Sequence, residues 1–112
     1  EYSKLFRTLY NSTYLSRTQS EYALNLLSRT SFTQGIVAGV PEGTQVSHKF
    51  GVRTATNEPG MNLNELHDCG IVYYANHPYF LCVMTRGKDF PTLEKVIAGA
   101  SSVVWSEVDD LH

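Results

Sequence analysis

The stretch HDCGIVYYANHPYFLCVMTRG, residues 67–87, decides the fold. Two of its runs, residues 69–74 and 79–85, are apolar and rich in β-branched and aromatic side chains, which is the composition of strands. Residues 75–78, ANHP, separate these runs with turn-forming side chains. The stretch therefore predicts a β-hairpin. Because both runs are apolar without alternation, we expect each strand to be covered on both faces or to lie in mid-sheet.

Further elements are predicted on either side of this hairpin. Residues 45–52 indicate a third strand, and residues 53–65, which include a Pro-Gly turn, indicate a polar loop. After the hairpin, Asp89 is placed to cap a helix that has Pro91 in its first turn. Apolar residues then recur at helical spacing and predict one broad face lying on the sheet. They are Leu93, Val96, Ile97, Ala100, Val103, Val104 and Val108.

The chain before the third strand is predicted to be helical and then irregular. A first helix is indicated by apolar residues at helical spacing, namely Leu5, Phe6, Leu9 and Tyr10. Ser16 is a good N-cap for a second helix over residues 17–29, and Gln19 completes a capping box. The glycines and proline of residues 31–45 favour connecting chain. The predicted fold class is α+β, an antiparallel sheet of three strands flanked by helices, without an internal domain boundary.

Composition excludes several classes of function. The 112 residues suit one compact domain or part of one, and the 42% apolar content supports a core. The net charge is −2 and the nine Lys and Arg residues form no basic stripe, so we expect no nucleic-acid partner. The longest apolar run, residues 70–74, is too short to span a membrane. The chain starts at Glu1 rather than Met, which we interpret as an excised or processed piece.

The residues that could bind a metal ion or act as a thiol nucleophile indicate neither a metal site nor a cysteine nucleophile. His67, Asp68 and Cys69 are adjacent, and neighbouring strand residues point to opposite faces, so they could not close on one ion. We expect Cys69 and Cys82 to be buried free thiols rather than a disulfide, because both lie in apolar runs. No nucleophile elbow, phosphate loop or dinucleotide fingerprint is present, and we expect no cofactor.

The run VSHKFGVR, residues 46–53, has two interpretations when taken alone. Lys49 could be an ordinary edge-strand lysine that blocks aggregation. Alternatively, the cation before Phe50 and Gly51 could form the wall of an active site. The motifs that follow the run favour the second interpretation.

The ordered set SHKFG, HDCGIVYY and PYFLCVMTRG, closed by an amphipathic helix, resembles the C-terminal part of the serine β-lactamase and penicillin-binding protein superfamily. The resemblance is nearest to the class A type and covers nearly the whole chain. It implies a partial β-lactamase/transpeptidase-like fold. Residues 1–112 would be the C-terminal segment of one hydrolase domain, and the N-terminal part with the nucleophilic serine would be absent. No Ser-x-x-Lys or Ser-Asp-Asn motif occurs here, so this chain alone is not expected to be active.

The resemblance assigns roles to the run that contains Lys49. Lys49 matches the catalytic motif lysine, Gly51 the motif glycine that lets substrate approach, and the Val52 N–H an oxyanion-hole donor. Phe50 departs from the family pattern, which has a Thr or Ser whose hydroxyl binds the ligand carboxylate. Arg53 or Thr54 is the candidate for a substitute contact.

The resemblance also implies a setting. The substrate would be a β-lactam or a D-Ala-D-Ala-like peptide, and the location would be periplasmic or extracellular, with roles in the cell wall or antibiotic resistance. The strand over residues 79–85 would need the N-terminal segment of the same protein, or a swapped copy, at its open edge. Two other interpretations remain: a non-catalytic homologue that binds a peptide or protein partner, and an unrelated α+β interaction module.

Overall fold

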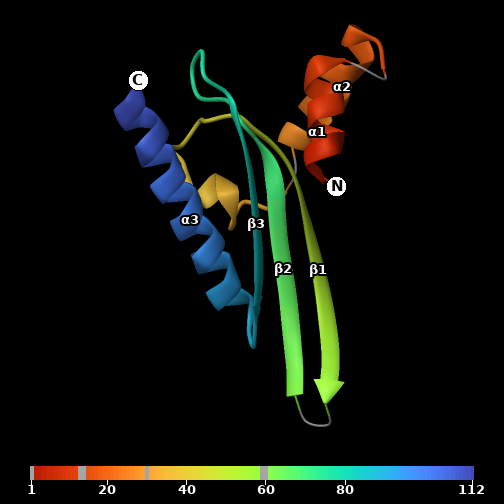
Figure 1. The fold of residues 1–112 in the computed structure, drawn as a ribbon, viewed down its shortest axis with the longest axis vertical. Coiled ribbons are helices and arrows are strands. Elements are labelled where there is room, and N and C mark those ends of the chain that lie inside the picture. The colour runs from red at the N-terminus through yellow and green to blue at the C-terminus, as the bar shows by residue number, and fades with distance from the viewer. Residues whose placement is uncertain (1, 13–14, 30, 59–60) are drawn as a thin grey trace.

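The computed structural model describes residues 2–12, 15–29, 31–58 and 61–112. It is an α+β arrangement in which a three-stranded antiparallel sheet has helices on both faces (Figure 1). Helix α3 and the short 3-10 helix η1 lie on one side of the sheet, and α1 and α2 lie on the other, near one end. No helix in the described ranges has the length and apolar character needed to cross a membrane.

The N-terminal helices form where the local sequence predicts them. Helix α1 covers Tyr2–Asn11 and α2 covers Arg17–Ser28. The Ser16 hydroxyl accepts a hydrogen bond from the Gln19 N–H, and the Gln19 side chain accepts one from the Ser16 N–H. This capping box satisfies two N–H groups that the start of a helix leaves unpaired. The predicted capping box is therefore confirmed.

The sheet contains β1 (Val46–Glu58), β2 (Met61–Val72) and β3 (Tyr79–Gly87), in the order β1-β2-β3. The predicted hairpin is confirmed as β2 and β3. The predicted polar loop over residues 53–65 is wrong, because β1 and β2 continue through most of it as paired strands. The backbone of this arm extends beyond the helices (Figure 1). The Pro-Gly turn lies outside the described residues.

Helix α3 (Phe90–Leu111) and η1 (Ile36–Gly39) cover one face of the sheet. The Asp89 side chain accepts a hydrogen bond from the Thr92 N–H at 2.9 Å, and Pro91 lies in the first turn, as predicted. The Ser101 hydroxyl donates to the Ile36 carbonyl at 2.8 Å and is fully buried. This contact joins α3 to η1.

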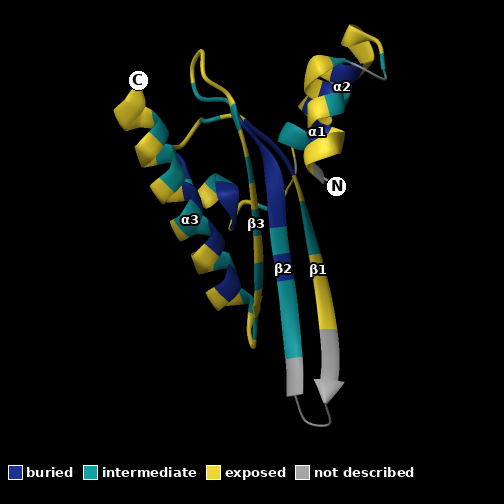
Figure 2. Ribbon diagram, in the orientation of Figure 1, coloured by how far each residue is buried: buried dark blue, intermediate teal, exposed yellow. Residues whose placement is uncertain are grey.

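Two clusters of side chains form the core. The larger one packs η1, α3 and the sheet, and the smaller one packs α1 and α2 on the other face; dark blue in Figure 2 marks the buried residues of both. The predicted single apolar face of α3 is wrong in part, since Val96 and Val103 are 51% and 69% exposed. The hydrogen bond of Ser101 turns that polar residue inward, while the two valines face away from the sheet. Side chains of β3 alternate between half-buried and exposed. The prediction that both faces of this strand are covered is therefore also wrong.

Cys69 and Cys82 form a disulfide between β2 and β3, which corrects the prediction of free thiols. The two residues are directly opposite each other in the strand register. Cys69 is fully buried, as expected, but Cys82 is exposed. The apolar run around Cys82 suggested burial, whereas the alternation of β3 places this side chain on its exposed face.

Candidate functional site

The predicted site strand is β1, an edge strand whose only partner among the described residues is β2. Side chains of a strand alternate between faces, so Lys49, Gly51 and Arg53 share one face. Lys49 and Arg53 are exposed and Gly51 is half-buried. The same face carries the Ser47 hydroxyl, which donates to the Leu24 carbonyl of α2 at 2.7 Å. The site face is therefore the one that α2 reaches, opposite α3.

The structure separates Phe50 from Lys49. The Phe50 ring points to the α3 side and stacks on Phe32, with ring centroids 4.5 Å apart and an interplanar angle of 27°. Val52 and Thr54 alternate to that same side by position. Val52 is 60% exposed, and the Thr54 hydroxyl donates to Asn64 Oδ1 at 3.0 Å. The predicted site residues therefore divide between the two faces of β1, with Lys49, Gly51 and Arg53 on the face opposite α3.

This surface also holds residues that the sequence did not single out. We call the part of this face that α2 does not cover the open face. The strand register and the alternation of side chains place on it Lys49, Gly51, Arg53, Glu65, His67, Met84 and Arg86. Arg86 Nη2 and Nε donate to Glu65 Oε1 at 2.7 and 3.2 Å. The hydrogen bond from Arg86 lowers the pKa of Glu65, and the charges of Arg86 and Arg53 act in the same direction. The three cations against one carboxylate give the open face a net charge of +2.

His67 lies across Gly51 on the open face. The two residues are paired in the register of β1 and β2. A Cβ atom added at Gly51 would overlap the imidazole, meeting Cε1 and approaching Nε2 to 2.5 Å. The glycine therefore leaves the space that the ring of His67 fills. Sequence reasoning missed this contact because it depends on strand register, which the unpredicted extension of β1 and β2 determines.

A buried polar pair lies on the opposite side of the strand. His48 Nδ1 donates to Asp68 Oδ1 at 2.8 Å, and the two residues are 1% and 0% exposed. The second carboxylate oxygen, Oδ2, accepts from the Ile36 N–H at 3.0 Å. The aspartate therefore ties β2 both to the residue before Lys49 and to η1. Sequence reasoning missed the pairing of Asp68 with His48.

The described residues contain no group of three or more His, Cys, Asp or Glu side chains that could hold a metal ion. Both cysteines are joined in the disulfide, so neither offers a thiolate.

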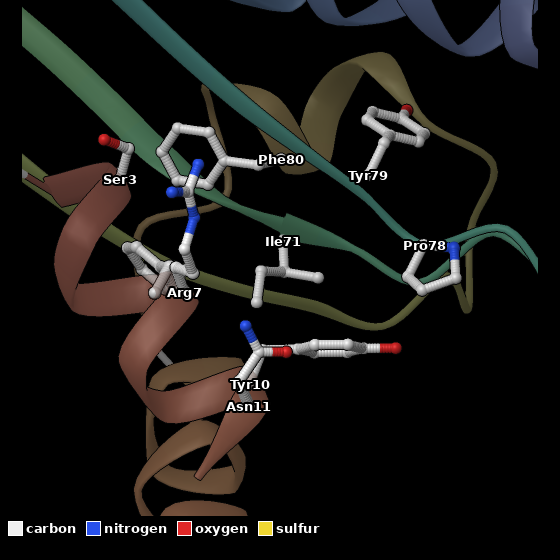
Figure 3. Close-up of a pocket in the computed structure, with 9 residues that line it drawn as sticks. Ser3, Arg7, Tyr10, Asn11, Ile71, Pro78, Tyr79 and Phe80 are labelled. Carbon is white, nitrogen blue, oxygen red and sulfur yellow. The ribbon is translucent and has the colours of Figure 1, made fainter. Parts of the chain in front are cut away.

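A cavity of about 240 Å³ lies between α1 and the start of β3 (Figure 3), and Lys49 is not among the residues that line it. Its apolar floor includes Ile71 and Phe80, and Phe6 of α1 contacts the Phe80 ring with centroids 5.7 Å apart. Arg7 and Tyr10 of α1 contribute to its rim. Its strand residues come from β2 and the start of β3.

Comparisons with known proteins agree on one family. Residues 1–108 match the family model described as the β-lactamase enzyme family. The TLA-1 extended-spectrum β-lactamase aligns with 94% of this chain and 39% of its own, at 26% identity and a TM-score of 0.77. PBP-A aligns with 95% of this chain and 37% of its own, at 19% identity and a TM-score of 0.72.

A mutant of PBP-A, solved as an acyl-enzyme complex with penicillin-G, aligns with 95% of this chain and 38% of its own, at 20% identity and a TM-score of 0.73. The chain thus spans less than two fifths of the length of these structures. A search of curated protein sequences finds no match.

Proposed function

Because this chain belongs to the β-lactamase enzyme family, we propose that it is part of a serine hydrolase of the β-lactamase and penicillin-binding type. It contributes the substrate-binding strand with Lys49 and Gly51, and the oxyanion-hole backbone at Val52. The observation that carries the proposal is that Lys49 and Gly51 share the open face of an edge strand. The nucleophilic serine comes from outside residues 1–112, so this chain alone is inactive.

The chemistry of the strand suits acyl transfer. The exposed ammonium of Lys49 attracts a substrate carboxylate and stabilises negative charge on a nearby hydroxyl. Gly51 matches the glycine of the family motif, and the ring of His67 fills the space beside it on the open face. The Val52 N–H supports the developing oxyanion, and the loss of one such donor costs other enzymes about 3 kcal/mol. Arg53, two residues beyond Gly51 on the open face, is the candidate for a further carboxylate contact, whereas the Thr54 hydroxyl is bonded to Asn64.

Phe50 favours an alternative, a non-catalytic homologue that binds a peptide or protein partner. Its ring stacks on Phe32 and can offer no hydrogen bond to a ligand. A lost hydrogen bond to a charged group is worth about 1.5–3 kcal/mol. The alternative therefore predicts binding without acylation, while the hydrolase proposal requires another donor to replace the missing hydroxyl.

We propose that the N-terminal segment of the same protein, or a swapped copy, completes the domain beside β3. Three features support this. The outer edge of β3 has no strand partner in the described residues. The Tyr79 hydroxyl is buried without a hydrogen-bond partner there, an arrangement that native structures rarely leave. The exposed Val96, Val103 and Leu111 give α3 an apolar outer side.

The disulfide supports a periplasmic or extracellular location, because such bonds persist in oxidising compartments. Substrates of the proposed type, cell-wall peptides and β-lactam antibiotics, are met in the same compartments. The proposal therefore includes a role in the cell wall or in antibiotic resistance.

Labelling of the full-length protein with a fluorescent penicillin tests the hydrolase proposal. We expect covalent labelling of the wild type, and a rate at least tenfold lower for Lys49→Ala, because the ammonium that attracts the substrate is removed. Lys95→Ala, which removes an exposed cation from α3, is the matched control and should label at the wild-type rate. A folded wild-type protein that remains unlabelled would favour the binding homologue instead.

A further inference from the structure

We infer that the turn between β2 and β3 and the end of α3 together form a binding site for a divalent transition-metal ion, held by the imidazoles of His77 and His112. The two rings are stacked, with centroids 3.5 Å apart and an interplanar angle of 11°. Both residues are exposed, and the segments that carry them lie at the same end of the molecule (Figure 1). Neither residue belongs to the open face, so the site does not depend on the proposed hydrolase activity.

Hydrogen bonds and ring packing hold the two segments together. The His77 N–H donates to the Tyr74 carbonyl at 2.9 Å within the turn. The His112 N–H donates to the Asp109 carbonyl at 3.2 Å at the end of α3. The Tyr74 hydroxyl donates to Asp109 Oδ1 at 2.7 Å, and the Tyr74 ring packs on Trp105 of α3 with centroids 5.0 Å apart. The turn and the helix end are therefore already joined, so binding an ion requires no large rearrangement and little loss of entropy.

The separation of the two rings suits two ligands of one ion. Imidazole nitrogens bind Zn²⁺ at about 2.0–2.1 Å, so two of them at a tetrahedral angle lie roughly 3.4 Å from each other. Nearly parallel rings 3.5 Å apart bring their edges close to that separation. A rotation of each exposed ring about its side-chain bonds then turns one nitrogen of each toward a shared ion. Water fills the remaining coordination positions.

The charges around the pair favour a cation. Asp109 and Asp110 are exposed carboxylates in the last turn of α3, and the carbonyl groups at the C-terminus of a helix carry partial negative charge. Asp109 lies three positions before His112, so their side chains are neighbours on the helix surface. The class of metal follows from the donors, because imidazole suits Zn²⁺, Cu²⁺ and Ni²⁺, whereas Mg²⁺ and Ca²⁺ prefer oxygen ligands.

An ion bound by both imidazoles links the turn between β2 and β3 to the end of α3. It binds the folded arrangement, in which the two histidines meet, and not the separated segments of the unfolded chain. The ion therefore stabilises the folded state by mass action. It also strengthens the attachment of α3 to the sheet that this helix covers.

Calorimetric titration of the metal-free full-length protein, without an affinity tag, with zinc chloride tests this site. We expect a site for Zn²⁺ that either His77→Gln or His112→Gln weakens about tenfold or more, since even the outer partners of metal ligands contribute that much. The double variant should bind no more weakly than either single variant, because the loss of one imidazole already breaks the chelate. In a thermal melt, Zn²⁺ should raise the Tm of the wild type but not that of the double variant, and Mg²⁺ should raise neither.

His67→Gln, which removes an imidazole from the open face, is the matched control and should keep the wild-type affinity for Zn²⁺. The inference is overturned if both single variants bind Zn²⁺ as the wild type does, or if the double variant retains the Tm shift. Two independent imidazole sites would leave each single variant with one site of unchanged affinity, and that result would also contradict a shared ion.

Discussion

Replacement of Asp68 by Asn tests how the strand before Lys49 is held. The carboxylate is fully buried and accepts from two donors, His48 Nδ1 at 2.8 Å and the Ile36 N–H at 3.0 Å. An asparagine of the same shape offers one acceptor oxygen, and its amide group would face the other donor. One buried donor is then left unsatisfied, at about 1–3 kcal/mol. We therefore expect Asp68→Asn to lower the free energy of unfolding by about 2 kcal/mol, the middle of that range.

Urea denaturation followed by circular dichroism measures this change. The matched control is Asp109→Asn at the surface, where the carboxylate accepts a single hydrogen bond from the Tyr74 hydroxyl at 2.7 Å. An amide oxygen can accept that bond equally, so we expect no measurable loss. If Asp68→Asn were as stable as this control, the buried pair would not hold β2 to β1 and η1 as described.

Cys82→Ser removes the disulfide to Cys69, which closes a loop with a sequence separation of 13, and should lower the free energy of unfolding by about 3 kcal/mol. Equal stability of the wild type with and without reductant would contradict this. Gly39→Ala inserts a Cβ only 2.6 Å from the Ser101 Cβ of α3, and this overpacking should cost about 1–3 kcal/mol in a thermal melt. Hydrogen bonds from Thr92 lower the pKa of Asp89 in the folded state. The resulting stabilisation is present above the unfolded carboxyl pKa and is lost as the pH falls through the lowered folded value. The Tm difference between wild type and Asp89→Asn should therefore shrink below about pH 4, and a constant difference would argue against it.

Local features of the fold could be predicted from the sequence. The capping box of Ser16 and Gln19 and the cap at Asp89 depend on residues three positions apart, so no knowledge of the tertiary structure is needed. The same is true of the hairpin around residues 75–78. The family resemblance rested on motifs in these predictable segments and on the run that contains Lys49, and the family match confirms it.

Features that depend on pairing between distant segments could not be predicted in this way. The polar continuation of β1 and β2 forms strand because each arm pairs with the other, not because either has a strand-like apolar pattern. The position of His67 over Gly51 follows from the same register. The disulfide also follows from the register, which places Cys69 opposite Cys82. The predicted turn at residues 75–78 leaves the two cysteines at unequal distances from its centre, so the sequence did not indicate this pairing.

The orientation of α3 was predicted only in part. The apolar pattern placed Val96 and Val103 toward the sheet together with Leu93 and Ile97. In the structure Leu93 and Ile97 are buried, the Ser101 hydroxyl donates to the Ile36 carbonyl, and both valines are exposed. A pattern of hydrophobic residues cannot register such a contact, because the acceptor lies 65 residues away in the sequence.

The measurement that tests the central claim most directly is the intact mass of the full-length protein after incubation with penicillin-G, followed by peptide mapping. Opening of the β-lactam ring by a serine adds the whole antibiotic to the protein, because the ring nitrogen remains attached to the acyl group. The account predicts one such adduct, located on a serine outside residues 1–112, and slower formation of it in Lys49→Ala. A folded protein without an adduct, or with the adduct on a serine within these residues, would contradict it.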